Sequence, residues 1–167
     1  MKQLLVLMIV CIAAAAFAQE DKSQRPSPPA QARGKSGNTS ITIDYSQPSV
    51  KNRQVWGALV PYGKVWRTGA NETTTIEFSA PVTIEGKKID KGRYALFSIP
   101  NEKSWTFIIN KGIKWGAFSY KEDEDVIRFD VPVKTDNQPV EKLTFDVSNK
   151  GEVTFRWADV ETGFNVK

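Results

Sequence analysis

Apolar and polar residues alternate one by one through much of this chain, and this period of two constrains the fold more than any other feature. Ile41, Ile43 and Tyr45, for example, are separated by single polar residues. Successive side chains of a strand point to opposite faces, so this alternation predicts half-buried β-strands. The pattern recurs in segments 74–78, 105–109, 127–133, 143–147 and 153–157.

One segment departs from the alternation in an informative way. Residues 95–99 are apolar at nearly every position, which predicts a strand buried on both faces. Turn residues punctuate the strands, and the glycines at 86 and 92 bracket a very short segment, 87–89. No stretch shows a helical period over three turns. About eight short strands predict an all-β domain over residues 38–167, a single antiparallel β-sandwich of jelly-roll-like form, with a barrel as the alternative.

The first eighteen residues have the form of a cleavable export signal. Lys2 precedes an uncharged apolar run from 4 to 16, and Ala16-Phe17-Ala18 fits the small-x-small cleavage pattern. A membrane anchor is the alternative, but the run is shorter than the ~20 residues a spanning helix needs. We therefore expect a protein that is exported, periplasmic or secreted, with no membrane span after cleavage.

Residues 19–37 are polar and interrupted by proline and glycine, without an apolar period. Such a segment cannot bury a core, so it is expected to be a disordered or extended linker before the domain.

Composition excludes several kinds of chemistry. The chain has no His, and its single Cys (Cys11) and both Met (Met1, Met8) fall within the signal segment. Catalysis by Ser-His-Asp or Cys-His groups and His- or Cys-ligated metal are thereby excluded, and we expect neither cofactor nor metal. Cleavage after residue 18 removes one Lys and no acid, lowering the net charge from +4 to +3. A charge this small forms no basic stripe, so nucleic acid is not an expected partner.

The longest irregular stretch inside the domain, 46–73, is the first candidate site. Long connections in compact domains are usually functional or pack as caps. Aromatic faces there could stack on a sugar ring, and the polar side chains could make directional contacts. The structural alternative is that the aromatics plug one end of the sandwich while Arg67 pairs with a carboxylate. The candidate ligand-binding residues of this stretch are Trp56, Tyr62, Trp66, Arg67, Asn71 and Glu72.

A second irregular stretch, 111–125, adds Trp115 and Tyr120, which we expect on a wall of the same cleft. It ends in the acidic run 122–125. Loop sites for Ca²⁺ also need a glycine turn and a distal bidentate acid, which are missing, so this run is expected to be a solvated charged turn.

Several motifs in this sequence resemble one known family. The longest runs from Val60 to Glu72, and others are 41–50, 91–100, 115–120 and 153–157. Across residues 36–167 the chain resembles the exported bacterial proteins grouped as domain of unknown function 2911. The resemblance implies an envelope or secreted location, and it implies neither an activity nor catalytic residues. Arg93 stands where the pattern more often has a small polar residue.

Three functions are compatible with these residues. The first is a non-enzymatic exported module that binds a small polar or carbohydrate-like ligand, or an envelope protein partner. The second is a hydrolase of envelope glycans that uses two carboxylates, Glu72 with Asp44 or with a member of the acidic run. The third is a purely structural or interaction module. The aromatic and polar loop favours binding over catalysis.

Overall fold

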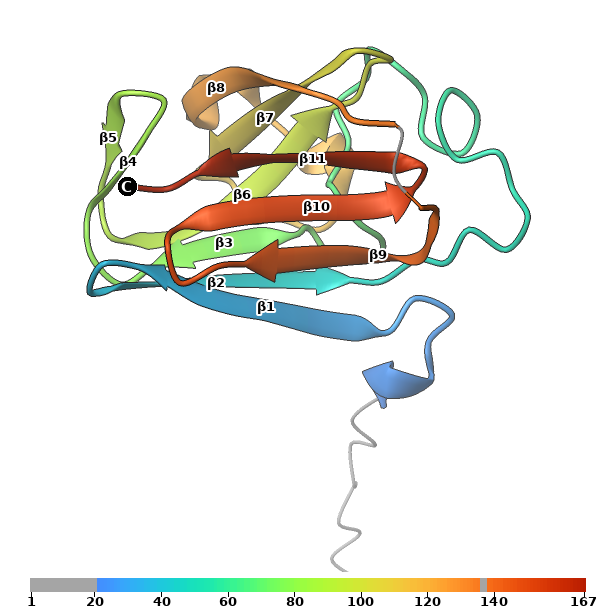
Figure 1. The fold of residues 1–167 in the computed structure, drawn as a ribbon, viewed down its shortest axis with the longest axis horizontal. Helices are drawn as coiled ribbons and strands as arrows, with labels where there is room; N and C mark the ends of the chain where they lie inside the picture. The colour runs from blue at the N-terminus through green and yellow to red at the C-terminus, as the bar shows by residue number, and fades with distance from the viewer. Residues whose placement is uncertain (1–20, 136–137) are drawn as a thin grey trace, which may run out of the picture.

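The computed structural model describes residues 21–135 and 138–167, so the expected signal segment 1–18 lies outside the described residues. The described part is all-β, with eleven strands and three single-turn 3₁₀ segments (Figure 1). The strands are β1 (Pro29–Ser36), β2 (Thr39–Ser46), β3 (Thr75–Phe78), β4 (Val82–Ile84), β5 (Lys87–Ile89), β6 (Gly92–Ile99), β7 (Ser104–Asn110), β8 (Asp125–Pro132), β9 (Val140–Val147), β10 (Glu152–Ala158) and β11 (Val160–Asn165). The 3₁₀ segments are η1 (Lys22–Gln24), η2 (Ala117–Ser119) and η3 (Glu122–Glu124).

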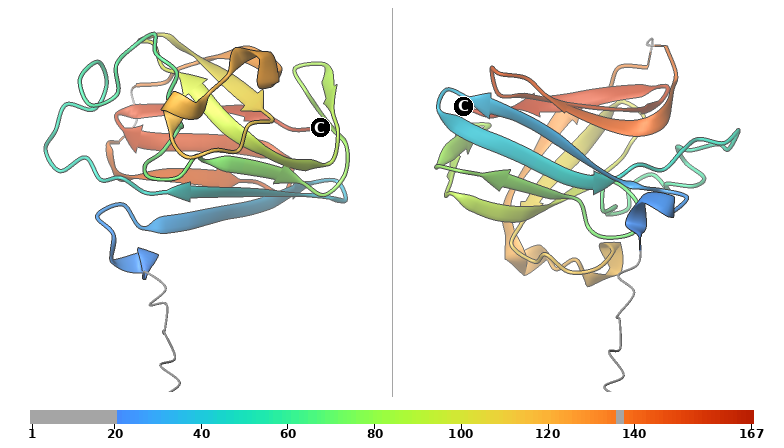
Figure 2. Two further views of the ribbon diagram at one scale, coloured as in Figure 1. Left: turned by 180° about the vertical axis from the view of Figure 1, so that it is seen from behind. Right: turned by 90° about the horizontal axis from the view of Figure 1, so that it is seen from below.

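The strands form two facing layers, visible edge-on in the right-hand view of Figure 2. One layer is a six-stranded antiparallel sheet in the order β1-β2-β3-β6-β7-β8, and the other is a three-stranded antiparallel sheet in the order β11-β10-β9. The short hairpin β4–β5 leaves the large sheet between β3 and β6. The predicted all-β sandwich is confirmed. Within the large sheet the strand order is a meander, because sequential strands are neighbours, whereas a jelly roll interleaves its strands between two sheets.

The core lies between the two sheets and follows the predicted alternation. The large sheet contributes Ile43 from β2 and Trp105 and Phe107 from β7, and the small sheet contributes Phe155 and Trp157 from β10. Each is nearly or completely buried. Burial of a large apolar side chain stabilises the fold by roughly 1.5–3 kcal/mol, so these five side chains hold the two sheets together.

Strand β6 is buried on both faces, as predicted. Leu96 joins the core between the sheets, whereas Ala95 and Phe97 pack with Ile108 on the opposite face of the large sheet. We call that face the outer face. A second small cluster forms there because Val65, Ile99 and Tyr120 cover it.

The N-terminal boundary differs from the expected one. Segment 29–36, expected as part of a disordered linker, forms β1 and pairs with β2 along its whole length, so that part of the expectation is wrong. Its inward residues are small: Ala32 is buried, and a Cβ at Gly34 would lie 2.3 Å from the carbonyl oxygen of Val147 on β9. Small residues give no strong apolar signal, yet they allow the two sheets to approach closely.

Candidate functional site

The connection between β2 and β3 lies at one end of the sandwich, where Figure 1 shows it as a long excursion beyond the strands. Its C-terminal part returns to the large sheet. The backbones of Trp66 and Ser98 exchange hydrogen bonds of 2.7 and 2.9 Å. This segment therefore pairs with β6 on the same edge as β3 does. The period of two then separates the side chains: Val65 joins the outer face, and Trp66 turns towards the core.

Four tryptophans, Trp56, Trp66, Trp105 and Trp157, meet where this segment enters the core. The rings of Trp66 and Trp157 are stacked, with centroids 6.0 Å apart and planes 18° apart. Trp56 packs edge-on against Trp157 at 5.6 Å and is buried. Trp56 therefore closes the end of the sandwich, as the structural reading expected, while Trp66 is only partly buried.

Beside this cluster lies a pocket of about 230 Å³. Its walls combine the long connection with Trp157 of β10 and with Ser27 from the segment before β1. Two small residues, Gly69 and Ala70, leave room for the pocket. The lining residues are Ser27, Pro48, Arg53, Leu59, Val60, Trp66, Arg67, Gly69, Ala70 and Trp157.

Arg67 is the most unusual of the lining residues. Its side chain is partly buried, its Nε is fully buried, and this Nε has no hydrogen-bond acceptor among the described residues. Burial lowers the pKa of the guanidinium below its usual range, and no carboxylate of the described residues offsets that effect. The expected pairing of Arg67 with a carboxylate is therefore wrong.

A second donor in the pocket also lacks an acceptor. The indole Nε1 of Trp157 is buried without a hydrogen-bond partner among the described residues, as is that of Trp56, which does not line the pocket. The neighbouring indole of Trp66 is satisfied, because its Nε1 donates to the carbonyl oxygen of Gly69 at 3.1 Å. Two residues of the pocket lining thus each have a buried N–H donor without an acceptor among the described residues.

Glu72 and Asn71 lie next to the pocket and fasten the chain that precedes β1. The Glu72 carboxylate pairs with Lys22 at 2.8 Å and with Arg25 at 3.0 Å. The Asn71 amide donates to the carbonyl oxygen of Ser27 at 2.9 Å. The hydrogen bond from Lys22 is the main reason that the pKa of Glu72 falls from 4.5 to about 2. Both residues hold the pocket rim, and neither lines the pocket.

Tyr62, Trp115 and Tyr120 do not line this pocket either. Tyr62 is 37% exposed on the outer part of the connection, where its ring lies against Gly57. Trp115 is 60% exposed, and its ring contacts Phe118 at 5.8 Å. Tyr120 packs on the outer face of the large sheet, opposite the core face that Trp66 joins. The structure therefore does not bring the two irregular stretches together around one cleft.

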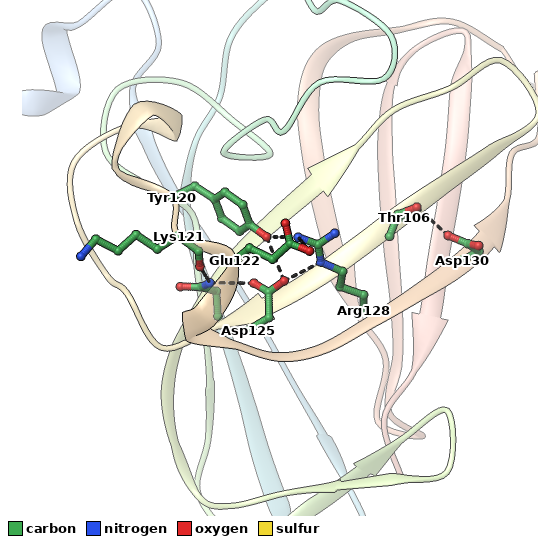
Figure 3. Close-up of polar contacts among 8 residues, drawn as sticks. Thr106, Tyr120, Lys121, Glu122, Asp125, Arg128 and Asp130 are labelled. Carbon is green, nitrogen blue, oxygen red and sulfur yellow. Dashed lines mark hydrogen bonds and ion pairs between the residues drawn. The ribbon is translucent and has the colours of Figure 1, made fainter.

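Tyr120 instead belongs to a polar network on the outer face, drawn in Figure 3. Its hydroxyl donates to Asp125 at 2.8 Å, and Arg128 donates to both Tyr120 and Asp125. The amide of Asn110 donates to the other oxygen of Asp125 at 2.7 Å. Burial, and then the bond to Asp125, raise the pKa of Tyr120 to about 12. These hydrogen bonds hold segment 111–124 against the sheet.

The acidic run is a solvated turn at its start, where Glu122 and Asp123 are exposed, but not at its end. Glu122 forms an ion pair with Arg128 at 3.4 Å, and the Asp125 side chain is only 12% exposed. Across residues 21–135 and 138–167, no group of three or more His, Cys, Asp or Glu is placed to hold a metal ion. Over the same ranges, no helix is long and apolar enough to cross a membrane.

The two carboxylates of the hydrolase hypothesis are engaged elsewhere. Asp44 pairs with Arg93 at 3.1 Å, and Glu72 holds Lys22 and Arg25. Neither carboxylate lines the pocket beside Trp66.

Trp157 and Ser27 are lining residues that the sequence did not single out. Trp157 follows the core alternation of β10, and Ser27 lies in the segment expected to be a linker. Nothing in their local sequence distinguishes them, because each reaches the pocket only through tertiary packing.

Comparison with known proteins gives one match. The model of a family described as proteins of unknown function, DUF2911, matches residues 27–166, in agreement with the resemblance of the sequence motifs. No curated protein and no solved structure matches the chain. The matched range includes β1 and Ser27 as well as the whole sandwich. The chain therefore belongs to the DUF2911 family.

Proposed function

We propose that this protein is an exported, non-enzymatic binding module whose pocket beside Trp66 takes one small, polar, carbohydrate-like ligand. Export is proposed from the signal-like pattern of residues 1–18. Binding is proposed from one observation: two residues of the pocket lining, Arg67 and Trp157, each have a buried N–H donor, Nε and Nε1, without an acceptor from the described residues. An unsatisfied buried donor costs about 1–3 kcal/mol, which a ligand oxygen can recover.

The walls of the pocket suit a sugar-sized ring. Trp66, which is only partly buried, offers aromatic surface against which the C–H face of a ring can pack. At about 230 Å³ the pocket is smaller than the ~300–1,000 Å³ of sites for drug-sized ligands, so it suits a single ring. A ligand of this kind would present oxygen acceptors to the two donors.

The absence of suitable acid–base groups favours binding over catalysis. A general acid or base is usually His, Asp, Glu, Lys, Tyr or Cys, and none of the ten described residues that line the pocket is of these types. Serine and arginine remain, and neither has a base beside it in the pocket lining.

Isothermal titration of the purified chain with glucose, galactose and the corresponding uronic acids tests the proposal. At least one of these sugars should bind saturably to one site. Trp157→Phe removes an N–H donor and keeps an aromatic ring, so it should weaken binding about fivefold or more, the equivalent of one hydrogen bond.

Trp115→Phe is the matched control, because Trp115 is exposed and does not line the pocket. It should leave the affinity unchanged. Absence of saturable binding by all four sugars, or an equal loss in both variants, would overturn the proposal.

A further inference from the structure

We infer that the ligand of this pocket carries a carboxylate and that Arg67 is the residue that receives it, so that the ligand is a small cyclic acid of the uronic-acid class. This inference rests on the proposed function and adds the charge of the ligand to it. It depends on the balance of charges in the pocket rather than on the pocket's shape.

The charge of Arg67 has no counter-charge among the described residues. Four other arginines each have a carboxylate partner, whereas no carboxylate of the described residues lies within ion-pair distance of Arg67. A guanidinium stays protonated in proteins, so Arg67 keeps its charge although it is partly buried. A partly buried, unpaired cation is unfavourable, and an anion beside it would restore the balance. The paired arginines are Arg25, Arg93, Arg128 and Arg156.

A second guanidinium reinforces the positive charge. Arg53 lines the same pocket, and its Nε donates to the carbonyl oxygen of Val50 at 3.0 Å. Its terminal nitrogen donates to the carbonyl oxygen of Ser49. These bonds orient Arg53 without neutralising it, because both acceptors are backbone carbonyls. The described residues of the pocket lining therefore include two cations and no acid.

The surroundings favour a carboxylate over a phosphate. Phosphate sites are commonly built on helix N-termini or on nests of backbone N–H groups. The described residues contain no α-helix, and the unpaired donors here are side-chain groups of Arg67 and Trp157. A planar carboxylate matches the planar edge of a guanidinium. The partly buried aromatic ring of Trp66 suits the ring that would bear this carboxylate.

Glucuronate and glucose form a matched pair for the test, because they differ only in the oxidation of one exocyclic carbon. Isothermal titration with both sugars, at an ionic strength kept constant with NaCl, should show that glucuronate binds at least about tenfold more tightly. Arg67→Gln should reduce this preference to near one. Arg93→Gln is the control, because Arg93 pairs with Asp44 away from the pocket, and it should keep the preference.

The possible outcomes separate the two proposals. If glucose and glucuronate bind the wild type equally, the carboxylate inference fails and the proposed binding function stands. If neither the neutral nor the acidic sugars bind, both proposals fail. Should Arg67→Gln not fold, Arg53→Gln replaces it and should lower the preference in part. An unchanged preference in Arg53→Gln and in any folded variant of Arg67 would overturn the inference.

Discussion

Acid should weaken this fold partly through one carboxylate, that of Glu72. This residue joins the long connection to the chain before β1 by pairing with Lys22 and Arg25. Glu72→Gln keeps the size of the side chain and removes its charge. We expect this variant to be less stable than the wild type at neutral pH and equally stable in strong acid.

The size of the effect follows from the lowered pKa. A fall in the Glu72 pKa from 4.5 to about 2 corresponds to about 3 kcal/mol of stability if solvent does not screen the interaction. The Glu72 side chain is 40% exposed, however, so solvent screens the interaction and about 1 kcal/mol is a better expectation. Because the folded-state pKa is the lower one, the stabilisation is complete above about pH 4.5. It is lost as the pH falls from 4.5 to about 2.

Urea denaturation of the wild type and Glu72→Gln at several pH values measures this difference. The gap in unfolding free energy should be about 1 kcal/mol near pH 6 and should close between pH 4.5 and 2. Glu152→Gln is a matched control, because Glu152 is exposed on β10 and forms no ion pair among the described residues. A gap that stays constant with pH, or that is equal in the control, would refute the role assigned to Glu72.

Three further predictions concern other parts of the fold. Gly151→Ala should destabilise the protein by about 2–3 kcal/mol in urea, because Gly151 has a φ of +82° and a Cβ there would lie 2.0 Å from the carbonyl oxygen of Val166; an unchanged midpoint would contradict this. Tyr120→Phe should lose the phenolate step near pH 12 in an ultraviolet titration and about 1–3 kcal/mol of stability, because Asp125 loses a donor. Arg67→Met should keep the stability within about 1 kcal/mol, because no ion pair is broken, and a larger loss would reveal a partner.

Strands with large inward side chains could be predicted from the sequence, and strands with small ones could not. The alternation in β2, β7 and β10 places bulky residues on one face, and the structure buries them there. β1 has alanine and glycine at its inward positions, so its alternation is faint in the sequence. β11 buries Val160, Thr162 and Phe164, but its threonine and glycine weaken the alternation of apolar and polar residues in the sequence.

The candidate site was predictable only in part, for a similar reason. The length and aromatic content of the β2–β3 connection pointed to Trp66 and Arg67, which do line the pocket. Trp157 reads as an ordinary core residue of its strand, because its place at the pocket depends on how the two sheets face each other. Trp115 and Tyr120 were expected on the same cleft, yet neither lines the pocket, and Tyr120 packs against the outer face.

Binding at the pocket beside Trp66 would satisfy N–H donors that have no acceptor among the described residues. The most direct measurement is a ¹H–¹⁵N spectrum of the five tryptophan indoles during a titration with glucuronate. The Trp157 indole should move most, because its N–H would gain an acceptor, while that of exposed Trp115 should stay in place. Assignment by Trp157→Phe identifies the signal. A spectrum in which the Trp157 signal does not move at saturating glucuronate, or in which Trp115 moves instead, would contradict the account.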